Sequence, residues 1–358
     1  MNRALHNQAT ISGRRAFTIL ELVVVVAIIT ILISLIAPAL SDARNASRLL
    51  TCSNNLRQLA LGMAGQIETT NRYPYAHRSS AVRGHYIHRA NWVTDILPWI
   101  DESNVGYELD QYDSINDYIK SGGARHHLPL LTCPADISVT GSDDLSYGAN
   151  TGVAQAFSGQ TNKNYYFFLS NLGHTIDLNG DGRIDYHKNE SPGRPDAASI
   201  QFATSLFLVA GDKGDFPGLK RLKGHRPATV SDGSSNTIML IENVRCGADP
   251  LDPRSGWIFA KISNLSAGIP ETVCKEGFCG DGSVDLERAN LGLRRINSGL
   301  ILPEGSAPWA NSFHSGGANA AFADGRVQFV SESISGRVLF QMYTPQDDHL
   351  GHTAFQSH

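Results

Sequence analysis

The chain has 358 residues, with 34 acidic and 30 basic side chains and a formal net charge of −4. Proteins that bind nucleic acid need clustered Lys and Arg, and here the basic residues form only short groups such as Lys220-Arg221-Leu222-Lys223. We therefore expect no nucleic-acid partner. The length allows one large domain or two small ones beyond a terminal segment.

A long apolar segment near the N-terminus, residues 17–40, contains a single charged residue, Glu21. As a helix rising about 1.5 Å per residue it would extend roughly 36 Å, enough to cross a hydrocarbon core about 30 Å thick. Arg3, Arg14 and Arg15 precede it, which predicts a cytoplasmic N-terminus and an exported remainder. A charged side chain inside such a helix costs about 2.5–3.5 kcal/mol, so we expect Glu21 to have a partner.

The order of features separates this segment from an ordinary secretory signal, in which the cleavage site follows the apolar core. Here the basic pair Arg14-Arg15 and the small Ala16 come first. The pattern resembles the class III signal of type IV prepilins and type II secretion pseudopilins, although Ala16 stands where Gly is usual. The resemblance implies that residues 1–16 are a cytoplasmic leader, cut between Ala16 and Phe17, and that Phe17 is then N-methylated.

The same resemblance implies the partners of the chain. They are a prepilin peptidase/N-methyltransferase, other pilin-like subunits that pack through the N-terminal helix, and the bacterial inner membrane. The new amino group of Phe17 would neutralise Glu21 in the low dielectric between packed subunits. The head would then lie in the periplasm or at the cell surface. A plain uncleaved N-terminal anchor is the alternative.

The helix is predicted to continue beyond the membrane, because apolar residues recur there at spacings of three and four. We predict one pilin-like helix over residues 17–70, ending before Tyr73-Pro74. Pro38 lies inside it and removes a backbone hydrogen bond, so we expect a kink there. The residues of the apolar stripe are Leu49, Cys52, Leu56, Leu59, Met63 and Ile67.

The remaining residues, 71–358, form the predicted extracytoplasmic head. Turn pairs such as Gly122-Gly123 and Asp232-Gly233 separate short β-branched runs, which is typical of antiparallel sheet. The predicted fold class is α+β, a long helix packed on an antiparallel β-rich head, with an insertion over about residues 160–200. We predict strands at 237–241, 256–260 and 326–330, and helices near 94–100 and 103–120.

A second resemblance rests on His314, followed after nine residues by Asp324-Gly325. It resembles the His-x9-Asp-Gly motif of bacterial prepilin-like proteins whose C-terminal domain has no assigned biochemical function. Asp-Gly between alternating runs predicts a type I′ hairpin, and we expect the His314 ring to dock on it and to hydrogen-bond a turn group such as Asp324. Further matching segments are Cys52 with residues 54–58, and residues 133–136, 146–150 and 232–237.

The insertion contains a sequence similar to a calcium-binding loop. Oxygen donors fall at alternate positions, whereas Lys188 occupies position 12, where a bidentate Glu is usual. We predict a weak Ca²⁺ site, with an acidic loop that binds nothing as the alternative. The candidate ligands are Asp177, Asn179, Asp181, Arg183 and Asp185, with Glu190 or a carbonyl left to complete the shell.

Five cysteines and an exported location permit disulfides. Cys274 and Cys279 could close a small loop, and Cys52 could join Cys133 and tie the helix to the sheet. Cys246 would be left over. The alternative is that the cysteines are free and act as small buried apolar residues.

These patterns predict a leader-cleaved, N-methylated pilin-like or pseudopilin-like structural subunit and not an enzyme. One alternative is a membrane-anchored adhesion or glycan-binding protein, with Trp92, Trp99, Trp257 or Trp309 as stacking surfaces. Another is a tethered hydrolase that uses His314 and an Asp as a base pair, although the sequence has no Gly-x-Ser-x-Gly or His-Glu-x-x-His motif to supply the remaining groups.

Overall fold

The computed structural model describes most of the chain, and its contacts divide the chain into two compact units, Met1–Ser47 and Arg48–His358. The described residues are 18–82, 85–123, 125–152, 204–210, 224–247, 256–258, 265–269, 289–292, 295–305 and 307–346.

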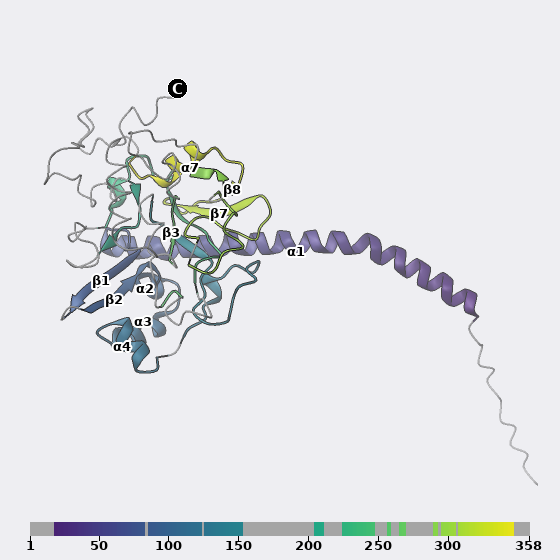
Figure 1. Ribbon diagram of the computed structural model, residues 1–358, viewed down its shortest axis with the longest axis horizontal. Coiled ribbons are helices and arrows are strands. Elements are labelled where there is room, and N and C mark those ends of the chain that lie inside the picture. Colours follow the sequence, from purple (N-terminus) through teal and green to yellow (C-terminus); the bar gives the residue numbers. More distant parts are fainter. Residues whose placement is uncertain are drawn as a thin grey trace, which may run out of the picture. The chain divides into compact units, whose positions relative to one another are not determined.

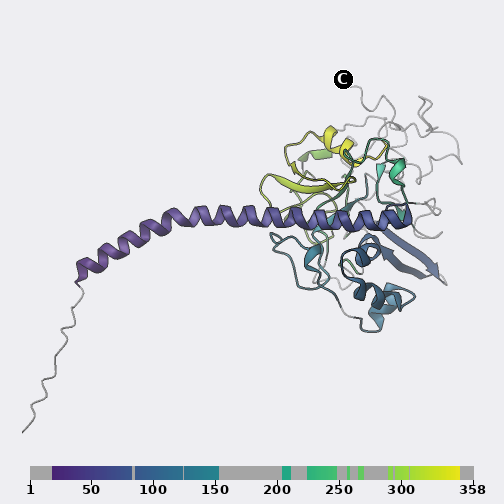
Figure 2. The same cartoon turned by 180° about the vertical axis from the view of Figure 1, so that it is seen from behind.

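One long helix, α1, runs over Ile19–Thr70 and ends where the apolar stripe predicts (Figure 1). The helix runs through Pro38 without interruption and is drawn as one unbroken coil in Figures 1 and 2; the kink expected at Pro38 stays a prediction. The stripe residues Cys52, Leu56, Leu59 and Met63 are fully buried. This confirms that the second half of the helix is amphipathic.

The second unit contains two sheets. The larger has the strand order β6-β3-β5-β7-β8, antiparallel except for the parallel pair β3 and β6, and the smaller has the order β2-β1-β4. The larger sheet and the buried stripe of α1 share one hydrophobic core. The strands are β1 (His77–Val82), β2 (His85–Asn91), β3 (Tyr147–Asn150), β4 (Val209–Ala210), β5 (Ile238–Glu242), β6 (Ser266–Ala267), β7 (Gly317–Phe322) and β8 (Val327–Ser331).

Short helices complete the α+β fold, which confirms the predicted class. The blue elements α2, α3 and α4 group with the β1–β2 hairpin in both ribbon views. The helical regions predicted near 94–100 and 103–120 are each split into two pieces. The helices are α2 (Trp92–Ile96), η1 (Leu97–Trp99), α3 (Ser103–Asp110), α4 (Ile115–Lys120), η2 (Pro129–Leu131), η4 (Pro227–Thr229) and α7 (Gly336–Tyr343).

One predicted strand is wrong over its described part. Gly256, Trp257 and Ile258 form a turn, in which Gly256 has a φ of +99°. The Trp257 amide donates to the carbonyl of Asp143, and the Trp257 indole is fully buried. The apolar run thus reflects burial of a turn and not a strand.

Candidate functional site

The N-terminal end of α1 places Glu21 beside Thr18. The amide and the hydroxyl of Thr18 both donate to Glu21 Oε2 at 2.9 Å, and the Glu21 amide donates to Thr18 Oγ1 at 3.3 Å. These reciprocal bonds form a capping box, for which the spacing Thr-x-x-Glu is the sequence signal. Ala16 and Phe17 lie outside the described residues, so the pairing of Glu21 with the Phe17 amine stays a prediction.

The first half of α1 is long and apolar enough to cross a membrane. Its large side chains are exposed from Ile19 to Leu40. An apolar surface of this extent is unusual for a soluble monomer and marks a site of interaction with lipid or protein. The helix is therefore compatible with a membrane anchor.

A disulfide joins the second half of α1 to the segment that leads into β3. The Sγ atoms of Cys52 and Cys133 are bonded, with their Cα atoms 5.2 Å apart. Beside them, Asn55 Nδ2 donates to the carbonyl of Thr132 at 3.0 Å. Both cysteines are buried. The bond fastens the helix to the core of the head.

His314 lies against this disulfide and not against Asp324. Its Nε2 is 3.4 Å from Cys133 Sγ and 3.5 Å from Glu242 Oε1. The expected bond to Asp324 is wrong, because Asp324 Oδ1 instead accepts from the Arg326 amide within the turn. His314 lies just before the first residue of β7, and the Asp324-Gly325 turn follows the last one. The two motif residues are therefore at opposite ends of this strand.

Glu242 is a fully buried carboxylate at the end of β5. Its Oε1 accepts from Asn319 Nδ2 and its Oε2 from the Asn319 amide, both at 2.9 Å. Tyr147 pairs with Glu242 across β3 and β5, and burial, together with the Glu242 charge, raises the pKa of Tyr147 well above its ordinary value. The two bonds from Asn319 thus fix the orientation of the carboxylate, between neighbours on β3 and β7.

The Asp324-Gly325 turn joins β7 and β8, as its sequence predicts, but it is not type I′. A type I′ turn needs positive φ at both central residues, whereas Gly325 has a φ of +86° and Asp324 is not in this region. The Gly325 amide donates to the carbonyl of Phe322 at 2.9 Å. This is the arrangement of a longer hairpin loop, in which a left-handed Gly follows the turn.

The other segments that match the His-x9-Asp-Gly group also make structural bonds. Asp136 Oδ2 accepts from Ser146 Oγ at 2.6 Å. Asn150 Nδ2 donates to the carbonyls of Ile238 and Tyr343, both at 2.7 Å. These side chains fasten β3 to its neighbours in the described structure, which explains their residue types without catalysis.

Residues 41–337 match a family described as a protein of unknown function (DUF1559). The chain belongs to this family. The DUF1559 match begins at Ser41, directly after the apolar segment, and ends within α7. It contains both disulfide cysteines and His314. No curated protein and no solved structure shows a significant match to the chain.

Two of the predicted sites in this DUF1559 protein lie outside the described residues. They are the calcium-like loop, Asp177 to Asp185, and the pair Cys274 and Cys279. Both stay predictions. Cys246 is buried and forms no disulfide in the described structure, and burial raises the pKa of its thiol well above the ordinary value, which makes it a poor nucleophile.

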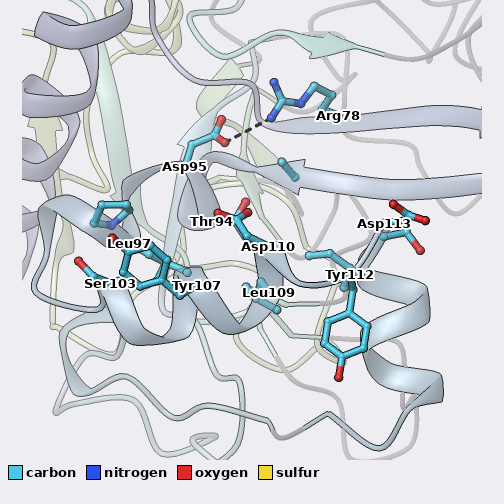
Figure 3. A pocket seen from close by; sticks show the side chains of 15 residues that line it. Arg78, Thr94, Asp95, Leu97, Ser103, Tyr107, Leu109, Asp110, Tyr112 and Asp113 are labelled. Carbon is cyan, nitrogen blue, oxygen red and sulfur yellow. Dashed lines mark ion pairs between the residues drawn. The ribbon is translucent and has the colours of Figure 1, made fainter.

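A pocket of about 390 Å³ lies where β1 and β2 meet α2, α3 and α4 (Figure 3). Arg78 Nη2 is 3.5 Å from Asp95 Oδ1 at its edge. Burial raises the pKa of Asp95 to about 6; the Arg78 charge opposes the shift and that of Asp110 adds to it. Asp113 and Tyr107 also line the pocket. Apart from the Arg78–Asp95 ion pair, nothing in the described lining points to a particular ligand.

The tryptophans proposed as stacking surfaces are mostly inside the head. Trp92 and Trp257 are fully buried and Trp309 is 6% exposed, so these three cannot stack on a glycan. Trp99 is 46% exposed, but its ring packs against Gly65 of α1. Three of the four proposed tryptophans are therefore unavailable as stacking surfaces, and Trp99 is the partly exposed one.

Proposed function

We propose that this DUF1559 protein is a pilin-like or pseudopilin-like structural subunit of the bacterial inner membrane. In this proposal, a prepilin peptidase cuts between Ala16 and Phe17 and methylates the new amine. The observation that carries it is the apolar first half of α1, with one carboxylate near its start and the Arg14-Arg15-Ala16 sequence before it.

The geometry of Glu21 supports this function. Both bonds from Thr18 go to Oε2, which leaves Oε1 available for a second partner. The amine of Phe17, on the same or a neighbouring subunit, would neutralise the charge within the membrane. The capping box and the assembly contact are therefore compatible, because they use different oxygens.

The head also suits a structural subunit. Cys52 and the buried stripe tie α1 into the core, so a force applied along the outer part of the helix would reach the head through a covalent bond. The residues of the His-x9-Asp-Gly motif hold strands and turns together. This favours display of a stable head over catalysis.

Crosslinking of the chain in membranes tests the proposal. Glu21→Ala should insert normally but lose crosslinked oligomers, because no carboxylate then sets the register of the subunits. Thr18→Ala removes the capping hydroxyl and keeps the carboxylate, and Ser34→Ala alters another hydroxyl of the same helix; both should retain the oligomers. Unchanged crosslinking of Glu21→Ala would contradict the proposal, and an equal loss in Thr18→Ala would assign the effect to capping.

A further inference from the structure

Four metal-ligand side chains converge in the core of the second unit. Cys52, Cys133, Glu242 and His314 each offer one donor atom, and these atoms all lie within 4.8 Å of one another. All four residues are buried. They come from α1, from the segment after η2, from β5 and from the loop before β7, so only the folded head brings them together.

We propose that in its dithiol form, before Cys52 and Cys133 are joined, this cluster is a four-coordinate Zn²⁺ site. Zinc binds Cys sulfur at about 2.3 Å and His nitrogen or carboxylate oxygen at about 2.0–2.2 Å, in a tetrahedron whose ligand atoms lie about 3.3–3.8 Å apart. The distances from His314 Nε2 to Cys133 Sγ and to Glu242 Oε1 are 3.4 and 3.5 Å. Two edges of the tetrahedron already have the required length.

The orientation of His314 suits a metal better than a nucleophile. In a Cys-His-acid triad, the two imidazole nitrogens face different partners, one the nucleophile and the other the acid. Here the same nitrogen, Nε2, faces both Cys133 and Glu242. Several donors that point at one shared centre are what a metal site requires.

Glu242 has the support that metal-binding carboxylates usually have. Asn319 donates once to each oxygen, which fixes the carboxylate plane, and Oε1 retains a lone pair for a metal. Two thiolates and a carboxylate in a buried site also need positive charge. A divalent ion supplies it.

The zinc form and the disulfide exclude each other. Zinc binding releases one proton from each of the two thiols and forms two zinc–sulfur bonds. Disulfide formation takes two electrons from the same sulfurs, breaks those bonds and releases Zn²⁺ to solvent; a disulfide of the thiol-exchange class accepts the two electrons, takes two protons from water and becomes a dithiol. Zinc would therefore hold the head together until the disulfide replaces it. This proposal does not depend on assembly through α1.

Cobalt titration of the full-length chain in detergent tests the site. Protein reduced with a phosphine should bind one Co²⁺ with a sulfur-to-cobalt charge-transfer band and strong tetrahedral visible bands, and Zn²⁺ should displace it. The oxidised chain should lack these bands. Asn319→Ala should weaken zinc binding roughly 10–100-fold, and His314→Ala should abolish the tetrahedral spectrum.

The cysteines outside this cluster provide matched controls. Cys246→Ser and the double variant Cys274→Ser/Cys279→Ser should leave the cobalt spectrum unchanged, whereas Cys52→Ser should weaken the charge-transfer band. Near-ultraviolet circular dichroism of the buried Trp92 and Trp257 reports folding of each variant. Reduced wild-type chain without the charge-transfer band, or a Cys52→Ser variant with the full band, would overturn the proposal.

Discussion

The bond between Cys52 and Cys133 joins residues 81 positions apart in the sequence. A crosslink of this span restricts the unfolded chain, and removing a native disulfide typically costs about 2–5 kcal/mol. Because the bond also fixes α1 on the head, its loss should loosen the helix before the sheet.

Replacing both cysteines should therefore lower the free energy of unfolding of the oxidised chain. We expect Cys52→Ser/Cys133→Ser to lose about 2–5 kcal/mol in urea unfolding followed by tryptophan fluorescence. Cys246→Ser also removes a buried sulfur but no crosslink, so its loss should be smaller. Equal losses in the two variants would contradict this role of the disulfide.

Asp95 should make the stability of the head pH-dependent. Its pKa is raised from 3.8 to about 6, so the folded chain holds this proton more tightly than the unfolded chain does. The favourable effect of the proton is fully present below about pH 4 and is lost as the pH rises through 6. One pKa unit corresponds to about 1.4 kcal/mol, so the decrease in unfolding free energy reaches up to about 3 kcal/mol.

Asp95→Asn should remove this decrease, since the amide does not ionise. Urea unfolding at a series of pH values should show the variant more stable than wild type at pH 7 and similar to it near pH 4. Asp113→Asn changes an exposed carboxylate of the same pocket. Its unfolding free energy should decrease with rising pH as in wild type. If the unfolding free energy of Asp95→Asn decreased with pH as much as that of wild type, Asp95 would not be the cause of the pH dependence.

The β7–β8 hairpin depends on the left-handed conformation of Gly325. A Cβ added there would meet no atom within 4 Å, so any cost of substitution is conformational. Gly325→Ala should lower the unfolding free energy by about 1–2 kcal/mol. Gly325→Asn should cost less, because Asn tolerates this region. Thermal or urea unfolding compares the two variants, and equal losses would argue against the turn geometry described here.

The elements differ in how far the sequence predicts them. The stripe of α1 has the spacing of a helix, β5 is a continuous apolar run and the segment of β8 alternates, so all three carry a strong local signal. Strand β7, Gly317 to Phe322, consists largely of small residues, and the sequence predicts it only as the run before the Asp324-Gly325 turn. Its residue types follow from tertiary packing: a Cβ on Gly317 would collide with the carbonyl oxygen of Val330, and every residue of the strand is buried.

For the whole molecule, sequence motifs indicated which residues matter but not how they meet. Cys52–Cys133 was one of the candidate pairs. The partners of His314 could not be predicted, because Cys133 lies 181 residues away in the sequence and Glu242 comes close only through the pairing of β5 with β7. The buried cluster is thus a product of sheet topology, which a single sequence leaves open.

For the whole molecule, the central proposal is that its N-terminus is cleaved and methylated. Mass spectrometry of the chain isolated from native membranes tests this most directly. We predict a mature N-terminus at Phe17 that carries one methyl group on its amine, with the apolar half of α1 retained. An intact Met1, or cleavage after the apolar segment as in an ordinary secretory signal, would contradict it.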